Sequence, residues 1–110
     1  MIAGPYSSGA KTAEERAANL RAMNEAAYAI FKKGHIPVIG VNMALPVIEA
    51  AGEDKFDELM MPISLALTER CDAILRIGGA SSGADAEVES FKKRGLQVFR
   101  SVEEIVWVGN

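Results

Sequence analysis

Short apolar runs and longer segments of helically spaced apolar residues alternate along this chain. The short runs are typical of buried strands and lie at 1–4, 36–41, 73–77 and 96–100. In the longer segments apolar residues recur at three- and four-residue steps, which predicts helices over 13–33, 54–70 and 84–94. The alternation of strands with helices indicates an α/β domain.

The ends of the first two predicted helices carry distinct signals. Thr12 and Glu15 form a capping box at the start of the first helix, and Gly34 follows its last turn. Pro62 removes a backbone donor from the second helix, so we expect a kink there or a new helix beginning at Met61.

Two other segments are less regular. The segment 42–52 is either a loop or a short helix, because Pro46 interrupts it. Near the end of the chain, Ser101 is expected to cap a short turn of helix, and 105–108 is a candidate edge strand.

This pattern favours parallel strands joined by right-handed crossovers, with helices on both faces of the sheet. We expect one domain over residues 1–110, a three-layer, Rossmann-like or flavodoxin-like sandwich with a parallel sheet of four to five strands. Ligands of such sheets collect beyond the carboxyl ends of the strands. The loops 5–12, 42–46 and 78–83 are therefore the places to search for a site.

Composition narrows the classes of partner. Apolar residues make up 49% of the chain, which is typical of a folded globular protein. The net charge is −3, and the lysines and arginines are scattered among carboxylates. Because the chain lacks a basic face, we expect neither nucleic acid nor a membrane surface as a partner. Cys71 and His35 are single residues of their type, which argues against a disulfide framework, a zinc site or a Ser-His-Asp triad. We expect no metal and no cofactor.

Length and hydropathy point to location and assembly. No apolar run is long enough to span a bilayer, and the first residues lack the pattern of a signal peptide, so the expected compartment is the cytoplasm. A chain of 110 residues buries only about two-thirds of its unfolded surface, so a partner subunit would add stability. We expect a homo-oligomer, a dimer or tetramer.

The loop after the first strand nearly matches a phosphate-binding P-loop. Ala10 separates Gly9 from Lys11, whereas a P-loop needs the lysine directly after the glycine. No predicted strand ends in an acidic residue placed to hold magnesium. The turn is either a site for one phosphate or carboxylate at a helix N-terminus, or an ordinary capped turn.

Glu87 is the candidate catalytic residue. On a helical wheel it lies about 60° from the middle of the side defined by Ala84, Val88 and Phe91, whereas Glu89 lies about 140° away. A carboxylate near the first turn that leans toward the strand ends can act as a nucleophile or base. The alternative is a boundary residue in a charged surface network.

Several short motifs occur together in this sequence. Ala3-Gly4-Pro5-Tyr6-Ser7 closes the first strand, Gly34-His35 precedes the second, Cys71-Asp72-Ala73-Ile74 opens the third, and Ser81-Ser82-Gly83 lies four residues ahead of Glu87. This combination resembles the nucleoside 2-deoxyribosyltransferase-like superfamily, especially its branch of small proteins. The similarity covers nearly the whole chain.

The resemblance implies a transferase or hydrolase of nucleosides or nucleoside monophosphates. In that superfamily a glutamate attacks the anomeric carbon, and Glu87 matches it. Ser81 matches a position that assists the sugar or phosphate side, and the 42–46 loop is a candidate contribution to a neighbouring subunit's site. The implied substrate-binding residues are Gly4, Pro5, Tyr6, Ser7, Ser8, Asn42, Ser64, Ser81, Ser82 and Gly83.

The sequence departs from the family pattern at several positions. Ser64 stands where the family commonly has an aspartate that assists the leaving base, and a hydroxyl is no acid at neutral pH. The family's strand-one tyrosine falls at Met1, and the loop before Ser81 carries only small residues at 78–80.

These features leave three functions open. The first is cleavage or transfer of an N-glycosidic bond, and the second is a non-catalytic nucleotide-binding module of the same fold. A phosphoribohydrolase of the cytokinin-activating type is the third, loosely echoed by Gly78-Gly79 and by the spacing of Gly83 and Glu87.

Overall fold

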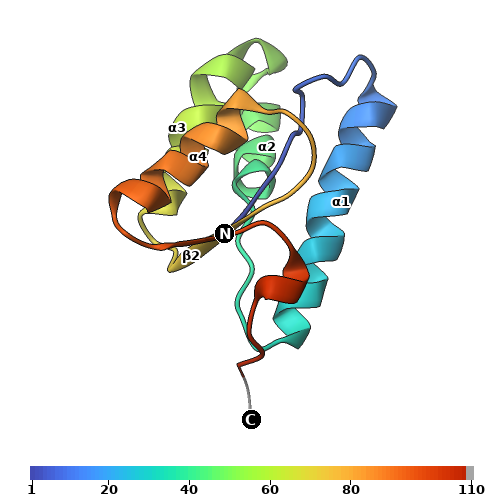
Figure 1. Cartoon of the computed structure of the whole chain (residues 1–110). Helices are drawn as coiled ribbons and strands as arrows, with labels where there is room; N and C mark the ends of the chain where they lie inside the picture. Colours follow the sequence, from blue (N-terminus) through green and yellow to red (C-terminus); the bar gives the residue numbers. More distant parts are fainter. Residues whose placement is uncertain (109–110) are drawn as a thin grey trace.

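The computed structural model describes residues 1–108, in which strands and helices alternate (Figure 1). In chain order the elements are β1 (Ile2–Ala3), α1 (Ala13–Lys32), α2 (Gly40–Ala51), the 3-10 turn η1 (Glu53–Lys55), α3 (Phe56–Thr68), β2 (Ala73–Arg76), α4 (Ser82–Lys93), β3 (Gln97–Phe99) and the 3-10 turn η2 (Val102–Glu104). The protein is therefore a mixed α/β domain.

The sheet is small and parallel, with β2 between β1 and β3. Ile2 aligns with Leu75, and Ile74 aligns with Val98. The expectation of four to five strands is wrong, because the described residues form three. Two of the predicted strands are missing, each for its own reason.

The predicted strand 36–41 is reduced to one parallel bridge between Ile39 and Ile2. The Ile2 amide also donates to the Val38 carbonyl at 2.8 Å, but α2 already begins at Gly40, which leaves too few extended residues for a ladder. The candidate edge strand 105–108 is not a strand either. Its backbone forms hydrogen bonds with the residues that follow α1. The Val106 carbonyl oxygen lies 2.8 Å from His35 Nε2, and the Val108 amide donates to the Lys33 carbonyl.

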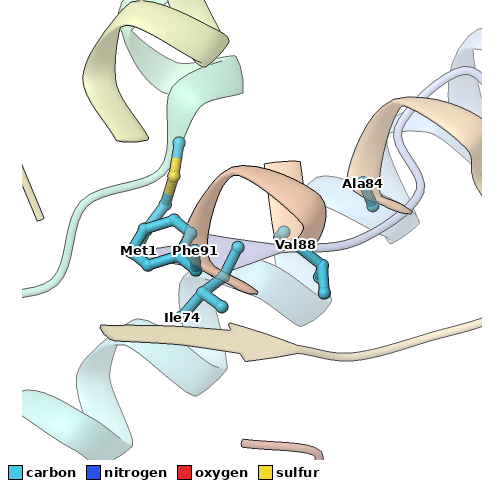
Figure 2. Packing of buried hydrophobic residues seen from close by; sticks show 6 residues of the cluster. Met1, Ile74, Ala84, Val88 and Phe91 are labelled. Carbon is cyan, nitrogen blue, oxygen red and sulfur yellow. The ribbon is translucent and has the colours of Figure 1, made fainter. Parts of the chain in front are cut away.

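Side chains from the two faces of the sheet enter different cores. On one face Met1, Ala3 and Ile74 pack against Ala84, Val88 and Phe91 of α4. Figure 2 shows Met1 and Ile74 beside Phe91 of this helix. On the other face Ile2 and Leu75 pack with Met23 and Ile30 of α1 and with Ile105. Helices α1 and α4 therefore cover opposite faces of the sheet.

Helices α2 and α3 pack on each other around a third apolar cluster of Ala44, Ile48 and Met60. The ambiguous segment 42–52 is helical, and Pro46 lies within α2. Helix α3 runs unbroken through Pro62, so no new helix begins at Met61. Burial of the apolar faces of α2 and α3 offsets the backbone donor that each proline removes.

The predicted cap at Ser101 is confirmed, because Ser101 forms a capping box with Glu104 at η2. Thr12 caps α1, since its hydroxyl accepts from the Glu15 amide at 3.1 Å, but the predicted capping box is incomplete because the Glu15 carboxylate accepts from the Lys11 amide instead of the Thr12 amide. Within residues 1–108, no helix combines the length and apolar character needed to cross a bilayer.

Candidate functional site

The loops that follow β1 and β2 meet the start of α4 beyond the carboxyl ends of these strands. Gly4 allows this approach, because a Cβ there would lie 3.0 Å from the Ile77 carbonyl oxygen. A larger residue would push the first loop away from the end of β2. The sequence therefore brings two distant loops to the same edge of the sheet, as expected for parallel strands.

Ser81 joins the two loops. It is the N-cap of α4, and its hydroxyl accepts from the Ala84 amide at 3.2 Å. The Ser8 hydroxyl donates to the same oxygen across 3.4 Å. Ser81 is 7% exposed, so this polar junction is largely shielded from water.

Glu87 lies one turn into α4 and is buried. The residue is only 8% exposed, whereas the Glu89 side chain, two positions along the same helix, is 59% exposed. The orientation predicted by the helical wheel is therefore confirmed. Burial of this carboxyl group disfavours its charged form.

Burial raises the pKa of Glu87 from its ordinary value of 4.5 to about 7. The amino group of Met1 and the guanidinium of Arg76 act in the opposite direction, because each favours the charged carboxylate. Near neutral pH the site thus contains both the acid and its conjugate base in comparable amounts.

Arg76, at the end of β2, fixes the second loop. It is 8% exposed, and its guanidinium donates to the carbonyls of Ile77 and Gly79 and to the Asp85 carboxylate at 3.1 Å. Because Asp85 lies in the first turn of α4, the arginine ties the strand end, the loop and the helix into one unit. The cation also lies close enough to Glu87 to influence its ionisation.

A small cavity of about 60 Å³ opens beside Glu87. Most of the predicted site residues line it, namely Gly4, Tyr6, Ser7, Ser8, Ser64, Ser81, Gly83 and Glu87. The structure therefore places residues from 4 to 87 around a single cavity that offers several hydroxyl groups and one carboxyl group.

The other predicted binding residues lie outside this cavity. Pro5 packs against Gly78, where an added Cβ would meet the proline ring at 2.7 Å. Asn42 donates instead to the Asn24 side chain of α1 at 2.8 Å, and Ser82 is an exposed residue at the start of α4. Asn42 and Ser82 therefore have access to solvent rather than to Glu87.

Sequence reasoning missed the apolar wall of the cavity, which consists of Val41, Phe56, Met60, Met61 and Ala84. Tyr6 stacks on Phe56 with ring centroids 6.3 Å apart and planes inclined by 17°. The helical spacing of Phe56 signals an apolar face but does not say whether that face meets a core or a ligand cavity.

No group of three or more histidine, cysteine, aspartate or glutamate side chains within residues 1–108 is arranged to hold a metal ion. A second cavity, of about 630 Å³, lies at the amino ends of the strands and does not include Glu87. The chemistry near Glu87 is instead that of a carboxyl group, serine hydroxyls and an aromatic and thioether wall. Such a set can bind a hydroxylated ring and attack an electrophilic carbon.

Comparison of the chain with protein-family models, with curated proteins and with solved structures finds no match.

Proposed function

We propose that this protein binds a nucleoside or nucleoside monophosphate beside Glu87 and cleaves or transfers its N-glycosidic bond. The observation that supports this most is the burial of Glu87 at a cavity that also exposes the hydroxyls of Ser8, Ser64 and Ser81. A carboxyl group whose pKa is raised by burial beside a cavity is costly to ionise, and such groups concentrate at functional sites.

The proposed reaction has two steps. A Glu87 carboxylate oxygen bonds to the anomeric carbon while the bond to the base nitrogen breaks, and the departing base keeps the electron pair and takes a proton from solvent. Water or a second base then bonds to the same carbon and loses a proton to solvent, while the bond to Glu87 breaks and the carboxylate leaves with the electron pair. The first step needs the ionised form of Glu87, which its raised pKa makes the major form only above about pH 7.

The alternative is a nucleotide-binding module that does not turn its ligand over. Ser64 lines the cavity where the resembled family commonly has an acid, so no neighbouring acid in the cavity wall assists the leaving base. The cavity volume, about 60 Å³, is also well below the roughly 300 Å³ of common ligand pockets. Binding of a whole nucleoside therefore requires the site to open or to be completed from outside.

We propose that a second copy of this chain completes the site. Met43 and Val47 of α2 are 56% and 45% exposed, and Leu65 of α3 is 37% exposed. These side chains extend the apolar surface of the helix pair that forms one wall of the site. Light scattering after size-exclusion chromatography tests for a dimer or tetramer, and a monomer at micromolar concentration would contradict it.

We also propose the finer fold assignment, a flavodoxin-like three-layer arrangement in a cytoplasmic protein. The parallel bridge between Ile39 and Ile2 supports it, because it puts the segment 36–39 on the outer edge of β1, where such a fold has its second strand. An experimental structure with this segment on another edge of the sheet would contradict it.

Release of free base tests the function. Wild type, Glu87→Gln and Glu89→Gln are incubated with a panel of nucleosides and nucleoside monophosphates, and the base is separated by liquid chromatography. We expect release by wild type and Glu89→Gln, faster at pH 8 than at pH 6, and none by Glu87→Gln. Equal release by all three proteins would exclude Glu87 as the nucleophile.

Stabilisation by ligand separates catalysis from binding alone. A nucleotide that raises the melting temperature of wild type and is recovered intact supports the binding module. A nucleotide that is consumed supports the enzyme, and if no ligand of either class stabilises the protein or is consumed, both functions are excluded.

A further inference from the structure

Helix α3 lines the candidate site with side chains that differ in how firmly they are held. Among the described residues it contributes Phe56, Met60, Met61 and Ser64 to the cavity wall. Phe56 stacks on Tyr6, Met60 is 7% exposed within the third apolar cluster, and Ser64 is 2% exposed. Met61 is half-buried and lies outside the three apolar clusters of the described residues. Its side chain can therefore move without opening a core.

The end of the Met61 side chain reaches the first turn of α4. A Cβ added to Gly83 would lie 3.0 Å from the Met61 sulfur and 3.7 Å from its terminal methyl carbon. Gly83 and Glu87 are four residues apart in α4, so they share one face of the helix. The thioether therefore lies along the helical face that carries the candidate nucleophile.

The backbone does not require a glycine at position 83. Gly83 has no positive φ, unlike Gly78 at 79°. Glycine is also a weaker helix former than alanine, so its presence within α4 lowers local helix stability. What it provides is space, because any side chain at this position would meet the Met61 sulfur.

The two sides of the cavity differ in chemistry. The hydroxyls of Ser8 and Ser81 come from the loops after β1 and β2, whereas the apolar side chains of Phe56 and Met61 come from α3. A sugar is rich in hydroxyl groups, and a nucleobase has flat faces that stack on apolar and aromatic side chains. A nucleoside with its anomeric carbon at Glu87 therefore directs its base toward α3 and the thioether.

We propose that Met61 is a specificity-determining residue, whose side chain limits the size of the base that the site admits. The inference rests on the proposed function at Glu87 and adds the class of base to it. The thioether occupies space beside Glu87 that the second ring of a purine needs, in a cavity of only about 60 Å³. The favoured substrates are therefore pyrimidine nucleosides or nucleotides, whose base has a single ring.

Base release from matched purine and pyrimidine nucleoside monophosphates tests this proposal. Wild type should have the higher kcat/KM for the pyrimidine, and Met61→Ala should raise the purine-to-pyrimidine ratio by about tenfold. Leu59→Ala shortens another side chain of α3, one that packs in the third cluster and does not line the cavity, so it should keep the wild-type ratio. A wild-type preference for the purine, or an equal change of ratio in both variants, would overturn the proposal.

A double-mutant cycle tests the contact across the cavity. Gly83→Ala should not lower the melting temperature, because alanine favours the helix and the sulfur belongs to a flexible side chain. It should nevertheless change the kcat/KM of wild type, and that effect should disappear when Met61→Ala removes the sulfur. The same effect of Gly83→Ala in both backgrounds would show that Met61 and Gly83 act independently, against the proposal.

The outcomes separate this proposal from the function on which it rests. If Glu87→Gln abolishes base release while Met61→Ala leaves the ratio unchanged, the catalytic proposal stands and the size limit fails. If the protein binds nucleotides without turnover, the ratio is measured from dissociation constants by calorimetry, with the same expected change. If Met61→Ala does not fold, Met61→Val should shift the ratio in the same direction by less, and no shift would overturn the size limit. A wild type that neither binds nor cleaves any nucleotide overturns both proposals.

Discussion

The hydroxyl of Ser8 donates to the hydroxyl of Ser81 across 3.4 Å, although 73 positions separate them in the sequence. Ser8 belongs to the loop after β1, and Ser81 caps α4 after β2. The contact holds together the two loops that surround the cavity beside Glu87. It also shows that one residue, Ser81, both stabilises a helix and shapes the candidate site.

These two roles of Ser81 can be separated. Ser81→Ala should lower the free energy of unfolding by about 1 kcal/mol, because the Ala84 amide loses its cap. Ser81→Asp should restore the stability, since aspartate caps equally well, yet it adds a second negative charge near Glu87 and should weaken binding of a nucleoside monophosphate. Urea denaturation measures the free energy of unfolding, and thermal shift measures the binding of the nucleotide. If Ser81→Asp were as unstable as Ser81→Ala, the capping role of Ser81 would be refuted.

The raised pKa of Glu87 makes stability depend on pH. Below pH 4.5 the carboxyl group is protonated in both the folded and the unfolded state. Between pH 4.5 and about 7 the folded protein binds more protons, so the free energy of unfolding falls as the pH rises, by on the order of 3 kcal/mol in total. Above about pH 7 this loss is complete.

Glu87→Gln should therefore be more stable than wild type at pH 8 but not at pH 4.5. Burial lowers the pKa of the Met1 amino group, which makes its contribution change in the opposite direction with pH. The difference between the two proteins in urea, measured at each pH, isolates Glu87. Glu89→Gln, at an exposed position of the same helix, should keep the wild-type profile. A constant difference between Glu87→Gln and wild type at all pH values would disprove the pKa shift.

Arg76 should matter more for stability than its ion pair does. Arg76→Met removes charged donors from two loop carbonyls, which should cost about 2–4 kcal/mol and raise the pKa of Glu87 further. Asp85→Asn should cost less than about 1 kcal/mol, because the Asp85 side chain is 65% exposed. Denaturant melts of the two variants check this order, and a larger loss for Asp85→Asn would reverse our interpretation.

The contact between α2 and α3 depends on Gly40. A Cβ at this position would lie 2.3 Å from the Ser64 hydroxyl oxygen and 2.8 Å from its Cβ, so Gly40→Ala should lower stability by about 1–3 kcal/mol. Combining it with Ser64→Gly should recover part of that loss. Gly79→Ala, where an added Cβ meets nothing within 4 Å, is the matched control. Additive effects of the Gly40 and Ser64 variants would show that the two residues do not clash.

The sequence predicted the parts of the fold that depend on local signals. The first helix is expected at 13–33 and observed at Ala13–Lys32, because both its cap and its apolar spacing are strong. Segment 36–41 was predicted wrongly, since its β-branched residues favour a strand while tertiary packing starts α2 at Gly40. The local pattern of apolar residues does not determine which other segment of the chain a given segment packs against.

The candidate site was predictable to a similar degree. Helical periodicity places Glu87 on the inner side of α4, and parallel topology brings its loops together. The apolar wall from Phe56 to Met61 was not predictable, because it depends on how α3 packs against the loops. Asn42 lies elsewhere for the same reason, since it pairs with Asn24 of α1.

The most direct test of the central claim is the mass of the protein trapped during reaction. Wild type is mixed with a nucleoside monophosphate, quenched in acid and digested, and its peptides are sequenced by mass spectrometry. Our account predicts a sugar phosphate esterified to Glu87 in wild type and Glu89→Gln, and no adduct in Glu87→Gln. Base release without any adduct on Glu87, or an adduct on another residue, would contradict it.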